Sequence, residues 1–154
     1  MTRAEQAKEY FYQGYNCSQS VVLAFKDLID VDESDLMKIS CSFGGGIGRL
    51  REVCGSVSGM MMVAGLLFGY DGPEKGEIKA NHYKRIQELA KEFEEKNGSI
   101  VCRELLGLSV KHDEPNPEER TEEYYKKRPC PELIKMAADI LEKYIDDQKS
   151  ISSN

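Results

Sequence analysis

The stretch from Val53 to Tyr70 contains no charged residue, and it constrains the fold more than any other feature of the chain. A helix that is apolar on every side belongs in a protein core or in a membrane. A membrane span needs roughly 18 or more predominantly apolar residues, so this run is close to that limit. Four glycines and two serines dilute its hydrophobicity, and the chain has no second run of this kind. We therefore predict a buried central helix and no stable membrane insertion.

Most of the remaining sequence repeats its apolar residues at helical spacing, without an alternating strand pattern or an internal repeat. A chain of 154 residues is long enough to form one domain with its own core. The expected fold is therefore all-α: a single-domain helical bundle over residues 1–146 around the glycine-rich central helix, followed by a frayed tail at 147–154. The other predicted helices span residues 3–12, 17–29, 33–41, 75–96, 100–106, 118–127 and 131–146.

Charge and the N-terminal residues limit the partners and the location of the chain. The formal charge of −6 argues against nucleic acid as a partner. The first ten residues lack the apolar segment of a secretory signal, so we expect a cytoplasmic location. In that compartment the five cysteines should be mostly reduced, which favours catalysis, redox sensing or metal binding over structural disulfides.

Four of the five cysteines fall at predicted helix N-termini, namely Cys17, Cys54, Cys102 and Cys130, whereas Cys41 falls near a helix end. Unpaired N–H groups and a partial positive charge at such positions favour a thiolate. If the four ends converge, the cysteines can form a pocket for thiol–disulfide exchange. The same cysteines could instead hold zinc or an iron–sulfur cluster, although no CxxC motif supports a metal site. Inert burial of the four thiols is the remaining alternative.

Cys54 is the candidate for the reactive thiolate. It lies in the predicted first turn of the central helix, and Arg49 and Arg51 add positive charge nearby. Because thiol pKa values fall in such surroundings, we predict a lowered pKa for Cys54. Its resolving partner would be Cys17, Cys102 or Cys130, and the sequence does not choose among them.

A glycine-rich loop precedes the central helix. Its candidate cofactor-binding residues are Gly45, Gly46, Gly48, Arg49 and Arg51. A phosphate-binding fingerprint needs a strand before the glycines, and no strand is predicted there. We therefore favour a sharp loop that lets the central helix start close to its neighbours. The glycine face of that helix would also suit a homodimer.

Five segments together make a specific pattern: NCSQ at 16–19, FGGGIGR at 43–49, CGSVSG at 54–59, CRELLG at 102–107, and Cys130. In these segments the chain resembles the C_GCAxxG_C_C family of redox-active proteins, from about Tyr10 to Cys130. Ser56 stands where the family usually has alanine, and Cys41 lies outside the pattern. The resemblance implies a redox role for the other four cysteines, with an unknown redox partner or small molecule. Family members are often encoded near transporter genes, which implies a functional link to transport.

Overall fold

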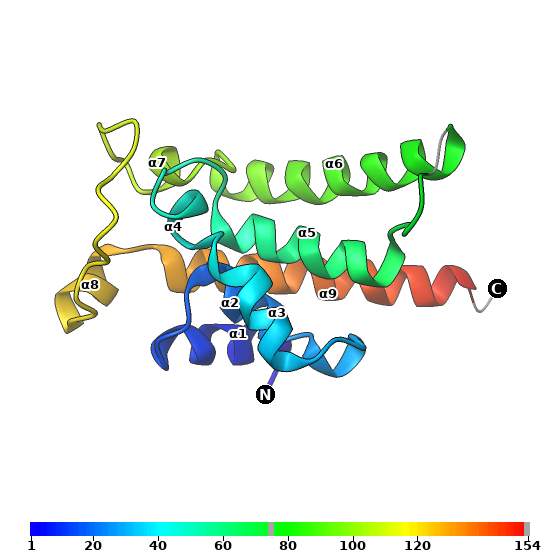
Figure 1. Ribbon diagram of the computed structural model, residues 1–154, viewed down its shortest axis with the longest axis horizontal. Coiled ribbons are helices and arrows are strands. Elements are labelled where there is room, and N and C mark those ends of the chain that lie inside the picture. Colours follow the sequence, from blue (N-terminus) through cyan, green and yellow to red (C-terminus); the bar gives the residue numbers. More distant parts are fainter. Residues whose placement is uncertain (74–75, 153–154) are drawn as a thin grey trace.

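The uncharged run forms the buried helix at the centre of the fold, as predicted (Figure 1). This computed structural model describes residues 1–73 and 76–152. Within those residues the chain is all-α, which confirms the predicted fold class, and one isolated bridge joins Val53 to Val101. The elements are α1 (Arg3–Tyr12), α2 (Cys17–Leu23), the 3-10 helix η1 (Lys26–Leu28), α3 (Glu33–Cys41), α4 (Gly44–Ile47), α5 (Gly55–Phe68), α6 (Glu77–Asn97), α7 (Cys102–Leu105), α8 (Glu122–Lys127) and α9 (Cys130–Ser152).

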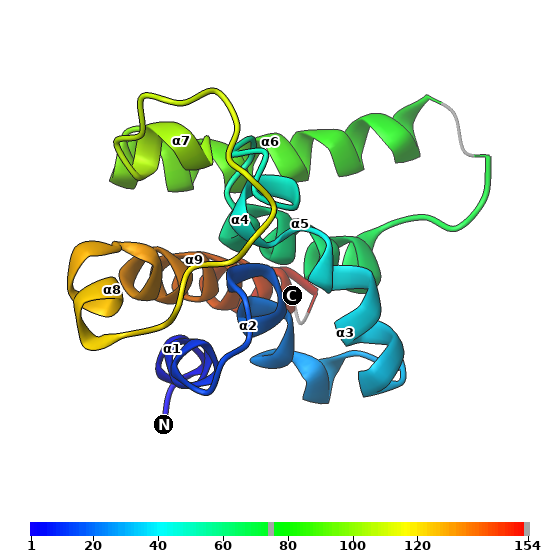
Figure 2. The same ribbon diagram turned by 60° about the vertical axis from the view of Figure 1, so that its left-hand side comes forward.

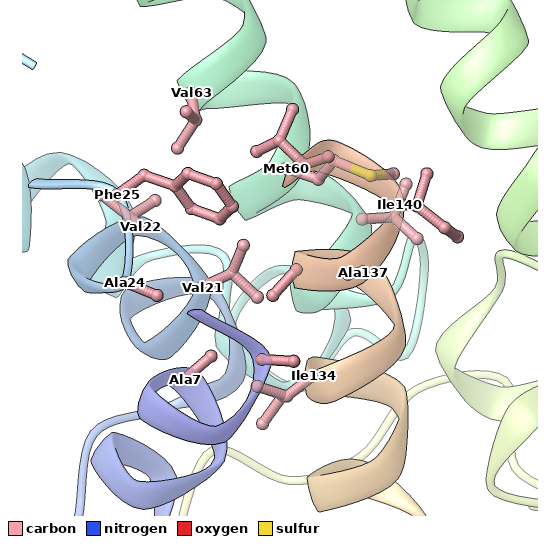
Figure 3. Close-up of a cluster of buried hydrophobic side chains, with 14 of the residues drawn as sticks. Ala7, Val21, Val22, Ala24, Phe25, Met60, Val63, Ile134, Ala137 and Ile140 are labelled. Atoms are coloured by element: carbon pink, nitrogen blue, oxygen red, sulfur yellow. The ribbon is translucent and has the colours of Figure 1, made fainter. Parts of the chain in front are cut away.

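Helix α5 packs against α2, α6 and α9, and only near its C-terminal end does a large apolar side chain, that of Leu66, remain exposed among the described residues of this helix. Val57, Met60 and Val63 are fully buried. Figure 3 shows Met60 and Val63 in one cluster with side chains from α2 and α9. Helix α1 packs against α2 and α9 and so covers the other side of this core (Figure 2). In the part of the chain that is described, no helix has the length and apolarity that a bilayer crossing needs.

Helix α2 begins with the predicted capping residue. The side chain of Asn16 accepts a hydrogen bond from the N–H of Gln19 (2.9 Å), and the Gln19 side chain accepts one from the Asn16 N–H (3.1 Å). This reciprocal pair satisfies two N–H groups at the helix start. Asn16 also donates to the carbonyl of Cys41 (3.0 Å), which ties the end of α3 to the start of α2. The cap therefore positions Cys17 directly beside the loop that follows α3.

Helices α2, α8 and α9 differ most in length from the prediction. Helix α8 begins at Glu122, whereas a start at residue 118 was predicted. Helix α2 ends at Leu23 and gives way to η1. There the N–H of Phe25 donates to the carbonyl three residues back, that of Val22 (3.1 Å), and Arg3 donates to the carbonyl of Ala24 (2.7 Å). A frayed tail was predicted from Asp147 onward, but helix α9 is continuous to Ser152. Its last turns line a groove together with residues of α5 and η1. Residues 153 and 154 of the predicted tail lie outside the described residues, as does the predicted start of α6 at residue 75.

Candidate functional site

Four cysteines from distant parts of the sequence line one cavity of about 290 Å³. Cys17 is the first residue of α2, Cys54 immediately precedes α5, Cys102 begins α7 and Cys130 begins α9. Their predicted positions at helix N-termini are therefore confirmed. Cys41 ends α3 on the protein surface. The cavity lies at the end of the bundle where α4, α7 and α8 gather (Figure 1).

The isolated bridge joins the two segments that contain Cys54 and Cys102. The N–H of Cys54 donates to the carbonyl of Ile100 (2.8 Å), and the N–H of Cys102 donates to the carbonyl of Glu52 (2.6 Å). These main-chain bonds are antiparallel, so the starts of α5 and α7 are held against each other. The register of the bridge thus fixes the positions at which Cys54 and Cys102 line the cavity.

Three glycines allow the cysteine-bearing segments to approach closely. A Cβ atom on Gly55 would collide with the sulfur of Cys17, and one on Gly46 would lie 2.7 Å from the Cβ of Cys102. On Gly59 it would lie 2.7 Å from a carbonyl oxygen of α2. The predicted small face of the central helix is therefore occupied by the first turn of α2. The CGSVSG segment can be understood physically as the contact surface that brings Cys17 to Cys54.

The loop before α5 holds an unusual backbone conformation. Ile47, Arg49 and Arg51 have φ values of 67°, 69° and 59°, in the left-handed region that side-chain-bearing residues seldom adopt. The N–H of Arg51 donates to the carbonyl of Gly45 (3.2 Å), and the N–H of Asp113 donates to the carbonyl of Arg49 (2.9 Å). Strained residues of this kind persist where the surrounding structure holds them, often at functional sites. Here the strained loop supplies arginine side chains to the cavity wall.

Arg51 pairs with Cys102 and not with Cys54. Its Nη1 atom donates to the sulfur of Cys102 (3.7 Å), while Nε and Nη2 donate to one oxygen of Asp113 (3.3 and 3.1 Å). Burial lowers the pKa of Arg51, but the Cys102 sulfur and the Asp113 carboxylate together raise it above its ordinary value. The bond from Arg51 lowers the pKa of Asp113. Arg49 also pairs with Asp113 (3.3 Å), so the predicted support of Cys54 by these two arginines is absent from this geometry.

The predicted low pKa of Cys54 is wrong. Burial raises the pKa of Cys54 above its ordinary value, and negative charge on Cys17 raises it further, whereas the hydroxyl and N–H of Ser56 act in the opposite direction. The same burial raises the pKa of Cys17, and it raises the pKa of Cys130 to about 12. A helix start favours the thiolate, but the sequence does not reveal how strongly the surrounding core removes water.

Most of the predicted cofactor-binding residues reach the cavity. Gly46 instead lies against Cys102, and the N–H of Glu52 donates to its carbonyl (2.9 Å). The predicted residues that line the cavity are Gly45, Gly48, Arg49 and Arg51.

The four cysteines do not form a metal centre with this geometry. Over residues 1–73 and 76–152, no group of three or more histidine, cysteine, aspartate or glutamate side chains is arranged to hold a metal ion. All five cysteines are free thiols. Zinc and iron–sulfur sites need three or four such ligands around one point, so these residues do not fit the alternative zinc or cluster site.

Sequence reasoning missed two arginines that complete the cavity wall, Arg120 and Arg128. Arg120 donates to the carbonyls of Phe11 (2.7 Å) and Tyr15 (3.1 Å). Arg128 forms an ion pair with Glu118. For Arg128 the sequence contained a usable signal, namely an arginine shortly before a cysteine at a helix start. Arg128 precedes Cys130 by two residues, and Arg51 precedes Cys54 by three. The position of Arg120 depends on contacts with α1 and has no local signal.

Comparisons with known proteins identify a family for this chain. Searches of curated proteins and of solved structures found no match. The family described as "Putative redox-active protein (C_GCAxxG_C_C)" matches residues 15–144, a range that contains all four cavity cysteines. Because this match covers most of the chain, the protein belongs to the C_GCAxxG_C_C family.

Proposed function

We propose that the cavity carries out thiol–disulfide exchange with a small molecule and that Cys102 is the attacking cysteine. The observation that carries this proposal is the bond from Arg51 to the Cys102 sulfur inside a cavity lined by three further thiols. A thiolate is the attacking species in such exchange, and a neighbouring guanidinium stabilises negative charge on sulfur. The raised pKa values of Cys54 and Cys130 keep those two thiols protonated near neutral pH.

Cys17 is the proposed resolving cysteine. Burial is the largest influence on its pKa, but the N–H groups of Gly45 and Ser18 act to lower it. Negative charge on Cys102 raises the pKa of Cys17, so the two sulfurs influence each other across the cavity. When Cys102 becomes part of a mixed disulfide it loses that charge. The Cys17 thiol then ionises more readily, at the stage when a second thiolate is needed.

With a disulfide RS–SR as the substrate, the proposed reaction has two exchange steps. The Cys102 thiolate attacks one sulfur, the S–S bond breaks, and the first RS⁻ leaves and takes up a proton. The Cys17 thiolate then attacks the Cys102 sulfur of the mixed disulfide, and the second RS⁻ leaves and is protonated. The protein loses two electrons and two protons, which reduce the substrate to two thiols. The reverse steps, with a dithiol as the reductant, restore the reduced protein.

The test uses reduced protein with Cys41 replaced by serine, because that exposed thiol would react outside the cavity. Added disulfide should oxidise two thiols of this protein, and mass mapping should identify the Cys17–Cys102 pair. Cys102→Ser should abolish the reaction, whereas Cys17→Ser should stop it at a mixed disulfide on Cys102. If Cys102→Ser reacts as fast as its parent, Cys102 is not the attacking residue.

A further inference from the structure

The cavity is cationic in a protein that is acidic overall. Its wall contains one carboxylate, that of Glu118, and the guanidinium groups of four arginines: Arg49, Arg51, Arg120 and Arg128. The whole chain carries a formal charge of −6, so this excess of positive charge is local. A cavity of about 290 Å³ suits a small molecule rather than a protein segment. The lining therefore points to a small anion.

Arg120 is the arginine whose charge is available to a ligand. Arg49 and Arg51 share Asp113, and Arg128 pairs with Glu118. The guanidinium of Arg120 is held by two main-chain carbonyls, and it stacks over the ring of Phe11 at 4.1 Å. Within the described residues, no carboxylate lies at salt-bridge distance from Arg120. Carbonyl bonds and the ring fix its orientation, but they leave its full charge without a partner of opposite sign.

A second feature of the cavity wall also points to a ligand. Ser56 lies in the first turn of α5, is completely buried and lines the cavity. Apart from its effect on the neighbouring Cys54 thiol, its hydroxyl has no hydrogen-bond partner among the residues that the structure describes. Buried hydroxyl groups without a partner are unfavourable, so this group suits an acceptor atom supplied from the cavity. The positive end of the α5 dipole favours a negatively charged acceptor at this place.

We propose that the molecule exchanged in this cavity is a small disulfide that carries carboxylate groups, and that Arg120 and Ser56 bind this negative charge. The inference rests on the thiol–disulfide function proposed above and names its substrate class. One anionic disulfide takes two electrons and two protons from Cys102 and Cys17 and leaves as two anionic thiols. Arg120 binds and orients the substrate, while the S–S bond is exchanged at Cys102.

The experiment compares three small disulfides that differ in charge: 3,3′-dithiodipropionate, which is anionic, bis(2-hydroxyethyl) disulfide, which is neutral, and cystamine, which is cationic. Rates of reaction with the reduced Cys41→Ser protein are divided by the rates of the same disulfides with free dithiothreitol, to remove their intrinsic reactivity. The expected result is a preference of about tenfold or more for the anion over the neutral compound, with the cation slowest. Added salt should weaken the preference.

Arg120→Gln should remove most of this preference, and Ser56→Ala should weaken it while leaving the contacts of Arg120 intact. Arg85→Gln is the matched control, because Arg85 also donates to a main-chain carbonyl and stacks over a phenylalanine ring, both of Phe68, but lies outside the cavity wall. Arg85→Gln should retain the preference. If Arg120→Gln does not fold, the Ser56→Ala variant alone must show the weakened preference.

The outcomes separate this inference from the proposed function. Equal normalised rates for the three disulfides would overturn the inference and leave thiol–disulfide exchange standing. Failure of all three to react would overturn the proposed exchange. In that case binding of 3,3′-dithiodipropionate to the variant with serine at all four cavity cysteines decides the charge inference separately. Binding that Arg120→Gln abolishes would support an anion site, and lack of binding would overturn it.

Discussion

The guanidinium of Arg51 lies 3.7 Å from the sulfur of Cys102, although 51 residues separate them in the sequence. Arg51 is only 4% exposed, and the other hydrogen bonds of its side chain go to the carboxylate of Asp113. A buried cation is favourable only with compensating partners. Asp113 supplies one negative charge, and a thiolate at Cys102 would supply another at the opposite edge of the guanidinium. The pair therefore couples the reactive thiol to the strained loop that contains Arg51.

Replacing Arg51 by glutamine should slow the reaction of Cys102. Glutamine removes the positive charge next to the sulfur, so we expect alkylation of Cys102 at neutral pH to fall by about tenfold, equivalent to about 1.4 kcal/mol. The measurement is the rate of iodoacetamide labelling at Cys102, followed by mass spectrometry. Arg49→Gln is the control, because Arg49 pairs with Asp113 without a bond to Cys102. Unchanged labelling in Arg51→Gln would show that the guanidinium does not activate this thiol.

Stability should fall as the solution becomes alkaline. The Cys130 pKa is about 12 in the folded protein because of burial, whereas an unfolded thiol has a pKa of about 8.5. The stabilising contribution is complete below about pH 8.5 and is lost as pH rises toward the folded value, because the unfolded chain releases its proton first. Between these values Cys130 alone should contribute a slope of at most about 1.4 kcal/mol per pH unit. Urea unfolding at several alkaline pH values measures how the free energy of unfolding changes with pH.

The comparison for this slope is Cys130→Ser, in which lysine and tyrosine titrations remain but the thiol is absent. The free energy of unfolding of this variant should decline less steeply with pH than that of the parent protein. Parallel curves for the two proteins would show that the Cys130 thiol has an ordinary pKa in the folded state.

Gly55→Ala should destabilise the protein, while Gly65→Ala on the same helix should not. A Cβ on Gly55 would collide with the sulfur of Cys17 and lie 2.8 Å from the carbonyl of Phe43. A Cβ on Gly65 would meet no atom within 4 Å among the described residues, apart from its chain neighbours and the backbone of its own helix. We expect a loss of about 1–3 kcal/mol for Gly55→Ala from overpacking. Gly65→Ala should gain up to about 1 kcal/mol from helix propensity. Urea titrations of both variants provide the test, and equal effects would contradict the close approach of α2 and α5.

Ile47→Asn should stabilise the protein. Ile47 has a φ of 67° and a side chain that is 37% exposed, so it suffers left-handed strain with little compensation from burial. Asparagine tolerates this conformation better, and the expected gain is about 1 kcal/mol. The control is Ile39→Asn, because Ile39 is exposed within the regular helix α3 and should gain nothing. A midpoint of thermal unfolding that is equal or lower in Ile47→Asn would contradict the strained backbone.

Protein purified without oxygen should contain no stoichiometric zinc or iron. The reason is geometric, because the described residues offer no group of three ligands around one point. Elemental analysis and a thiol count before and after a chelator test this expectation together. Bound metal that blocks the thiols until it is chelated would restore the alternative metal site and overturn the exchange function.

Local signals in the sequence were sufficient to predict most of the helices and the placement of four cysteines at helix starts. Asn16 and Gln19 form the capping pair that their spacing indicated, and the glycine-rich central helix is buried as its lack of charge required. These features depend on residues within a few positions of one another, where capping and periodicity operate.

Features that depend on distant contacts were not predictable in this way. The pKa of Cys54 was assigned the wrong direction because burial by other helices outweighs the effect of its own helix start. Arg51 has a left-handed backbone, so its side chain reaches Cys102 and not the cysteine three positions away in sequence. Arg120 belongs to the cavity because it bonds to carbonyls more than 100 residues earlier in the chain.

The packing of α9 against α1 has a consequence for biosynthesis. Helix α1 has α9 as its main partner, although most of this sequence lies between them, and Cys130 begins α9. A nascent chain that has not yet reached residue 130 lacks one of the four cavity thiols and also the helix against which α1 packs. The complete four-thiol cavity can therefore close only after α9 has been synthesised.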